Sequence, residues 1–245
     1  MDTFVSAWLS ARLLRHERRT STSYISALLV LISGAVSGCT RTAVPSYYIL
    51  TQSAPQTTDQ APESLSGVSV GIGPVRLPGR LDRPLIVTRV GGVGIKMHSF
   101  HRWGDTLQRQ IEEGVALRLG ATLGDARVMA YPWERVHRPD YQVLITVRTF
   151  EGELTGQVTL DATWRVVALN RDEMRLARRF RGRVPVEAGP RAEQLPSYVR
   201  AMSALTDQLA QEILRGLIKL GKPTSRRAVE EARSHADDSE RDDPR

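Results

Sequence analysis

Apolar and polar residues alternate along several stretches of the chain, and a two-residue period is typical of β-strands. The clearest case is the pair of segments 141–150 and 158–169, because the second segment carries Val, Leu, Ala, Trp and Val on one face and Thr, Asp, Thr and Arg on the other. Gly152 and Gly156 lie between the two segments, which predicts an antiparallel hairpin with one buried face. The same reasoning predicts a short β-prone patch at 47–50 and further strands at 68–73, 85–90, 93–97, 128–131 and 174–186.

Two other segments show the spacing of amphipathic helices, with apolar residues three or four positions apart. Residues 106–123 form the first, and Asp105 is the expected N-cap. Residues 197–220 form the second, with Ser197 as the expected cap after Pro196. The order of strands, helix, strands and helix predicts an α+β fold. We expect a two-layer sandwich with a largely antiparallel or mixed sheet and the two main amphipathic helices on one face.

An apolar run at residues 25–39 ends in Val36-Ser37-Gly38-Cys39 and contains the only cysteine of the chain. The run is shorter than the roughly 20 residues that span a membrane and matches the hydrophobic core of a secretory signal. Small residues before a cysteine are typical of a bacterial lipoprotein signal, so we predict cleavage before Cys39 and attachment of lipid to its thiol. Thr40, in place of an aspartate, favours the outer membrane. A plain signal peptide or an N-terminal membrane anchor is the alternative.

These features divide the chain into four predicted parts. They are a signal peptide (1–38), a lipidated N-terminus and tether with a short strand (39–66), a single globular α+β domain (67–220) and a disordered charged tail (221–245). The formal net charge of the whole chain is +7, and removal of the signal segment takes away +2. A protein beyond the inner membrane meets little nucleic acid, so the remaining positive charge favours an acidic partner or anionic lipid headgroups.

Candidate catalytic and metal-binding residues are few. His98, His101 and Asp105 are close in sequence, but they are fewer than the four ligands of a typical structural zinc site and no HExxH motif accompanies them. The glycines at 71–73 and 91–94 lack the features of a phosphate-binding loop, so we expect them in turns. We therefore predict no catalytic residue, no metal and no cofactor apart from the covalent lipid on Cys39.

Four arginines recur within the predicted strand 174–186 and would lie on one side of an extended chain. They are Arg175, Arg179, Arg181 and Arg183. Guanidinium groups in this arrangement suit an acidic protein surface or phospholipid headgroups. The alternative is an ordinary solvated outer face of the sheet.

Three further segments are notable: LPGRLDRPLIVTR at 77–89, HRWGDTL at 101–107 and Tyr131-Pro132-Trp133. Together they resemble the ABC-type transport auxiliary lipoprotein component family, which includes PqiC-like intermembrane transport lipoproteins. The resemblance covers about 39–220, and it departs from the family at 104–106, where Gly-Asp-Thr replaces the frequent Ala-Glu-Pro. Asp82 and Arg83 stand within the first segment, so the resemblance favours a protein-contact role for them over the shaping of a turn.

The resemblance implies a non-catalytic adaptor of an MCE/ABC-type intermembrane phospholipid transport system. It further implies an outer-membrane lipoprotein that faces the periplasm, an MCE-domain protein as partner, contact with phospholipid, and a homo-oligomeric ring. Two alternatives stay open: a solute-binding lipoprotein of an ABC importer, and a lipid-tethered periplasmic enzyme.

Overall fold

The computed structural model describes residues 44–51, 62–134 and 137–223. The chain divides into two units, Met1–Val44 and Pro45–Arg245, and every described helix and strand belongs to the second. The predicted signal segment, Cys39 and the tail from residue 224 lie outside the described residues. No helix in the described ranges is both long enough and apolar enough to span a membrane.

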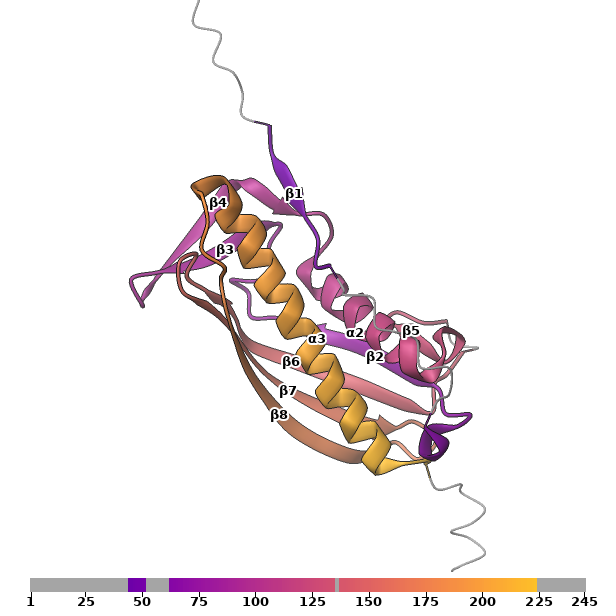
Figure 1. The fold of residues 1–245 in the computed structure, drawn as a ribbon. Helices are drawn as coiled ribbons and strands as arrows, with labels where there is room; N and C mark the ends of the chain where they lie inside the picture. The colour runs from indigo at the N-terminus through magenta and orange to yellow at the C-terminus, as the bar shows by residue number, and fades with distance from the viewer. Residues whose placement is uncertain (1–43, 52–61, 135–136, 224–245) are drawn as a thin grey trace, which may run out of the picture. The chain divides into compact units, whose positions relative to one another are not determined.

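Five strands form the larger sheet, in the order β5-β2-β6-β7-β8 (Figure 1). β5 and β6 pair in parallel with β2, whereas the pairs β6–β7 and β7–β8 are antiparallel, so the sheet is mixed. The hairpin expected from the alternation at 141–169 is confirmed as β6 and β7. The strand bounds are Val70–Arg76 (β2), Val128–Ala130 (β5), Tyr141–Gly152 (β6), Gln157–Ala168 (β7) and Glu173–Pro185 (β8).

Three strands form a second sheet, in the order β1-β4-β3. β1 covers Ser46–Tyr48, β3 covers Leu85–Val90 and β4 covers Gly94–Trp103. β3 and β4 form the hairpin that Gly91-Gly92 predicts, since both glycines have positive φ, 58° and 76°. β1 adds to β4 in parallel, and this pairing joins residues too far apart in sequence for the alternation to predict it.

Two helices, α2 (Leu107–Leu123) and α3 (Gln194–Leu220), cover one face of the larger sheet (Figure 1). α2 packs on β2 and β5, α3 packs on β7 and β8, and the two helices contact each other. This arrangement confirms the predicted α+β sandwich. The approach of α3 to the sheet is close, because a Cβ added at Gly216 would collide with the Trp164 ring and one added at Gly182 would lie 2.7 Å from Leu205 Cδ2.

The start of α2 differs from the prediction. Thr106 is the N-cap, and its hydroxyl accepts the N–H of Arg109 at 3.3 Å. The predicted cap, Asp105, lies one residue earlier and accepts the N–H of Thr106 at 2.6 Å. Two adjacent polar residues compete for the role, and the apolar spacing does not decide between them.

α3 also starts earlier than predicted. It begins at Gln194, so Pro196 lies in its first turn, where a backbone N–H has no partner within the helix and its absence costs little. Ser197 is not the cap; its Oγ accepts from Arg200 Nη2 at 2.8 Å. The helix ends at Leu220 as predicted, with Gly221 at φ 69° as C-cap.

The prediction that Gly71 and Gly73 lie in turns is wrong, because both residues lie within β2. A Cβ on Gly71 would lie 2.8 Å from the Trp133 ring, and one on Gly73 would lie 2.8 Å from Tyr131 Cβ, so both glycines leave room for the Tyr-Pro-Trp segment. β2 also continues through Pro74, beyond the end of the strand predicted at 68–73. The pairing with β6 shifts register at this point, and such irregularities accommodate proline in a strand.

Candidate interaction surfaces

The face of the larger sheet turned away from the helices carries the arginines of β8. Residues paired across β7 and β8 share a face, and the pairs are Thr163 with Arg179, Asp161 with Arg181 and Thr159 with Arg183. The alternate residues of β7, including Trp164, are buried beneath α3. Exposed Arg165 continues the outer face along β7. We call this set the basic face: Asp161, Arg165, Arg179, Arg181 and Arg183.

Asp161 is the one carboxylate of the basic face, and it holds two of the arginines in place. It accepts hydrogen bonds from Arg179 Nε at 2.8 Å and from Arg181 Nε at 3.3 Å. The hydrogen bond from Arg179 lowers the pKa of Asp161 from its ordinary value to about 2, so the carboxylate stays charged. Arg165 and Arg183 have no ion-pair partner among the described residues. The basic face therefore keeps a clear excess of positive charge.

Arg175 does not belong to the basic face. The β7–β8 pairing shifts register so that Val166 lies opposite Leu176 and Val167 lies opposite Met174, which leaves Arg175 at the bulge. Its guanidinium forms an ion pair with Glu173 at 3.2 Å. A bulge inserts one residue and breaks the alternation of faces. The alternation thus places Arg179, Arg181 and Arg183 correctly and misplaces Arg175.

Two residues of the basic face, Asp161 and Arg165, are not among the site residues predicted from the sequence. The polar half of the alternation in β7 contains both of them, so the signal was present. Only the pairing register of β7 with β8 shows that they lie beside Arg179 and Arg181.

Two of the three segments that carry the family resemblance meet at one hollow in the surface. The backbone N–H of Trp103 donates to Pro84 O at 2.8 Å, which joins the second segment to the first. Within the first segment, Arg83 Nε donates to Gly79 O at 3.2 Å and the N–H of Asp82 donates to Pro78 O at 3.2 Å. These bonds shape the turn before β3, and a subunit contact through Asp82 and Arg83 stays a prediction. The hollow is lined by Asp82, Arg83, Pro84, Trp103, Asp105, Thr106 and Leu107.

His98 and His101 lie close together on β4, with ring centroids 6.0 Å apart, but each has its own hydroxyl partner. His98 Nε2 lies 3.0 Å from Thr88 Oγ1, and His101 Nδ1 lies 3.0 Å from the Tyr48 hydroxyl. Burial lowers the pKa of His98, which keeps its ring neutral at neutral pH. Asp105 does not contact either histidine; its carboxylate forms an ion pair with Arg109 of α2. Across the described ranges, no cluster of three His, Cys, Asp or Glu side chains is arranged to hold a metal.

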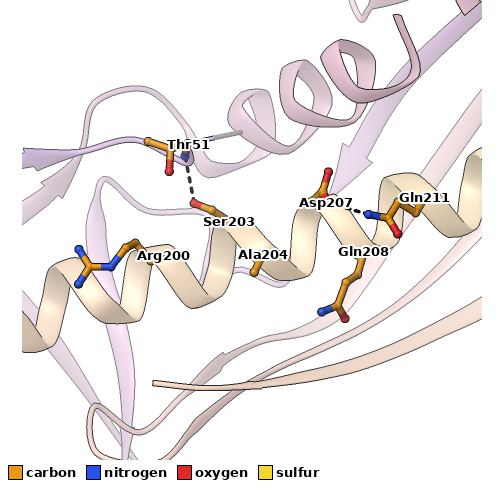
Figure 2. Close-up of a pocket in the computed structure, with 7 residues that line it drawn as sticks. All are labelled: Thr51, Arg200, Ser203, Ala204, Asp207, Gln208 and Gln211. Carbon is orange, nitrogen blue, oxygen red and sulfur yellow. Dashed lines mark hydrogen bonds between the residues drawn. The ribbon is translucent and has the colours of Figure 1, made fainter. Parts of the chain in front are cut away.

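Figure 2 shows a second hollow, along α3, whose polar groups largely bond to one another. Ser203 Oγ accepts the N–H of Thr51 at 3.0 Å, and Gln211 Nε2 donates to Asp207 Oδ2 at 2.8 Å. Asp207 also forms an ion pair with Arg118 of α2, with 3.4 Å between Oδ1 and Nε. These contacts fasten the chain after β1 to α3 and join α2 to α3. The lining residues of the hollow are Thr51, Arg200, Ser203, Ala204, Asp207, Gln208 and Gln211.

Solved structures share this fold at low sequence identity. A protein described only as uncharacterized is 18% identical, with a TM-score of 0.52, and the match covers 69% of this chain and 99% of that chain. Protein XCC0632 from Xanthomonas campestris is 14% identical, with a TM-score of 0.55, and the match covers 71% of this chain and 96% of that chain. No curated protein sequence matches this chain.

A protein-family model also matches this chain. The model described as ABC-type transport auxiliary lipoprotein component matches residues 48–214, which is more than half of the chain. The matched region runs from β1 through most of α3 and includes the basic face and the hollow at Asp82. This protein therefore belongs to the family of ABC-type transport auxiliary lipoprotein components.

Proposed function

We propose that this protein is a non-catalytic adaptor in an MCE/ABC-type system that moves phospholipids between the inner and outer membranes. A lipid on Cys39 holds it in the outer membrane, facing the periplasm, and several copies form a ring around the conduit. Family membership supports the auxiliary role in transport. The likeness of the segments at 77–89 and 101–107 to PqiC-like members supports the MCE-domain partner and the outer-membrane location.

The observation that carries the proposal is the basic face. Four guanidinium groups and one carboxylate lie on a single surface of β7 and β8, and two of the guanidinium groups have no ionic partner among the described residues. Arg165 and Arg183 can form bidentate bonds with the carboxylates of a partner, and Asp161 holds Arg179 and Arg181 in position beside them. Such a surface steers and orients an acidic protein partner. We assign the basic face as the docking surface for the MCE-domain protein.

Co-purification from membranes tests this assignment with the double variant Arg181→Glu/Arg183→Glu. Arg179 is left intact because it forms the main hydrogen bond to Asp161. Reversal of two charges places like charges against an acidic partner, so we expect recovery of the MCE-domain protein to fall about tenfold or more. Arg215→Glu on α3 is the matched control, because the Arg215 and Arg181 side chains are equally exposed at 65%.

The control should recover the partner at the wild-type level. Equal recovery by the double variant and the control would contradict docking through the basic face. If the wild-type protein instead recovers phospholipid without the MCE-domain protein, and the double variant does not, the basic face binds lipid headgroups.

A further inference from the structure

The hairpin of β3 and β4 ends in an apolar tip. Val93 is 100% exposed, and Val90 and Ile95 beside it are 53% and 45% exposed. Val90 pairs with Gly94 and Ile95 pairs with Arg89, so the two apolar side chains lie on opposite faces of the hairpin. Apart from the adjacent residues of the chain, no atom of the described residues lies within 4 Å of a Cβ built on Gly91 or Gly92. The hairpin tip, residues 90–95, thus presents aliphatic groups outward on both faces.

The backbone of the hairpin tip is nevertheless fixed. Arg89 Nη1 donates to Gly92 O at 2.9 Å, and the N–H of Val93 donates to Gly91 O at 2.9 Å. The N–H of Gly92 donates to Glu153 Oε1 at 3.4 Å, which ties the tip to the turn after β6. A preorganised loop loses little conformational entropy on binding. The exposed aliphatic side chains can therefore enter an apolar environment at a low cost in conformational entropy.

The charges around the hairpin tip favour an anionic lipid surface. Lys96 directly follows the tip, is exposed, and has no ion-pair partner in the part of the chain that the structure describes. Glu151 pairs with two cations, Arg80 at 2.9 Å and Arg89 at 3.1 Å, whereas the Glu153 carboxylate accepts only the Gly92 N–H among the described residues and keeps its charge. With Lys96, three cations therefore stand against two carboxylates near the tip. Aliphatic side chains with a lysine at their base are typical of segments that enter the interface of an anionic bilayer.

The predicted anchor brings a bilayer within reach of the hairpin tip. Cys39 precedes Ser46, the first residue of β1, by seven positions, which span at most about 25 Å. Ser46 pairs with His101 of β4, and the strand from His101 back to Gly94 is also seven positions, about 23 Å. A lipid on Cys39 therefore places the membrane surface at most about 25 Å from Ser46, a reach as long as the distance from His101 to the hairpin tip.

We infer that the hairpin tip inserts into the surface of the anionic bilayer to which the protein is anchored. It forms a second, non-covalent membrane contact beside the lipid on Cys39. Stable anchoring commonly takes two such signals, and the tip also fixes the orientation of the domain above the leaflet. This inference rests on the anchor of the proposed function but requires no transport partner.

Photo-crosslinking in cells that export the full chain tests the inference. The substitutions Val93→p-benzoylphenylalanine and Val90→p-benzoylphenylalanine place the probe on the tip. Leu117→p-benzoylphenylalanine on α2 is the matched control, because Leu117 and Val90 are 52% and 53% exposed. After irradiation, mass spectrometry of the purified protein should show phospholipid adducts at 93 and 90, about fivefold above those at 117. Lys96→Glu should lower the adducts at 93.

Two results would overturn the inference. Adducts at 93 with a protein in place of lipid would overturn the inference in favour of a protein partner. Lipid adducts at 93 no more abundant than at 117 would also overturn it. Metabolic labelling of Cys39 with radioactive palmitate, measured in the same cells, separates the two proposals. Lipid adducts at 93 without acylated Cys39 would support the tip and contradict the anchor, and acylated Cys39 without tip adducts would do the reverse.

Discussion

The buried carboxyl group of Glu112 connects α2 to strand β2 of the larger sheet. Its side chain is buried, and Oε1 accepts the N–H of Val75 at 2.7 Å, close to the register shift of β2. Burial raises the pKa of Glu112 above its ordinary value, although bonds from Val75 and Gln108 oppose the shift. The residue therefore provides a needed acceptor at the cost of burying a charge.

Glu112→Gln is expected to separate these two effects. The amide oxygen can still accept the N–H of Val75, whereas the buried charge disappears. Because the pKa of Glu112 is raised in the folded state, the wild-type protein loses stability as pH rises from the unfolded-state pKa through the folded-state pKa. The variant should therefore gain thermal stability relative to wild type at pH 7 and lose that gain near pH 4. Melting curves at both pH values provide the measurement, and a gain confined to pH 4 would contradict the account.

At the scale of elements, the smaller sheet is fastened to the rest of the domain by two buried polar groups. The Tyr198 hydroxyl of α3 donates to Val87 O of β3 at 3.0 Å and accepts the N–H of Gly152 of β6 at 3.2 Å. Burial raises the pKa of Tyr198, so the hydroxyl keeps its proton. Glu151 of β6 pairs with Arg89 of β3 from the outer face. Together these bonds fix the hairpin of β3 and β4, and hence its tip, relative to the larger sheet.

Tyr198→Phe should destabilise the protein by about 1–3 kcal/mol, because it leaves a buried carbonyl and a buried N–H without a partner. In a domain of this size each kcal/mol lowers Tm by about 2–4 °C. Tyr47→Phe is a suitable control, because Tyr47 is exposed. Loss of its hydroxyl should change the free energy of unfolding by less than about 0.5 kcal/mol. Hydrogen exchange should also quicken at β3 more than at β7, and equal exchange in both strands would contradict the role of Tyr198.

At the scale of the whole molecule, the parts that could be predicted are those with local signals. The hairpin of β6 and β7, the two helices and the α+β class follow from periodicity within each segment. The parallel addition of β1 and the separation of two sheets could not be predicted this way, because they depend on pairings between distant residues such as Tyr48 and Trp103. Buried Glu112 also looks like an ordinary exposed helix residue until Val75 is placed beside it.

Only part of the basic face could be predicted, because the sequence shows the alternation within one strand but not the pairing between two strands. Alternation along β8 places Arg179, Arg181 and Arg183 on one side, but it cannot reveal the bulge that separates Arg175. The bulge depends on how β7 and β8 pair, and the pairing register is a property of two strands together. The contribution of Asp161 and Arg165 likewise emerges only once the strands are side by side.

The salt dependence of binding between the full-length lipoprotein and the proposed MCE-domain partner tests the central claim most directly. If the basic face docks an acidic surface, affinity should fall about tenfold between low and high ionic strength, and the Arg181→Glu/Arg183→Glu variant should bind weakly with little dependence on salt. Wild-type affinity that does not change with salt, or a double variant that binds as tightly as wild type, would contradict docking through the basic face.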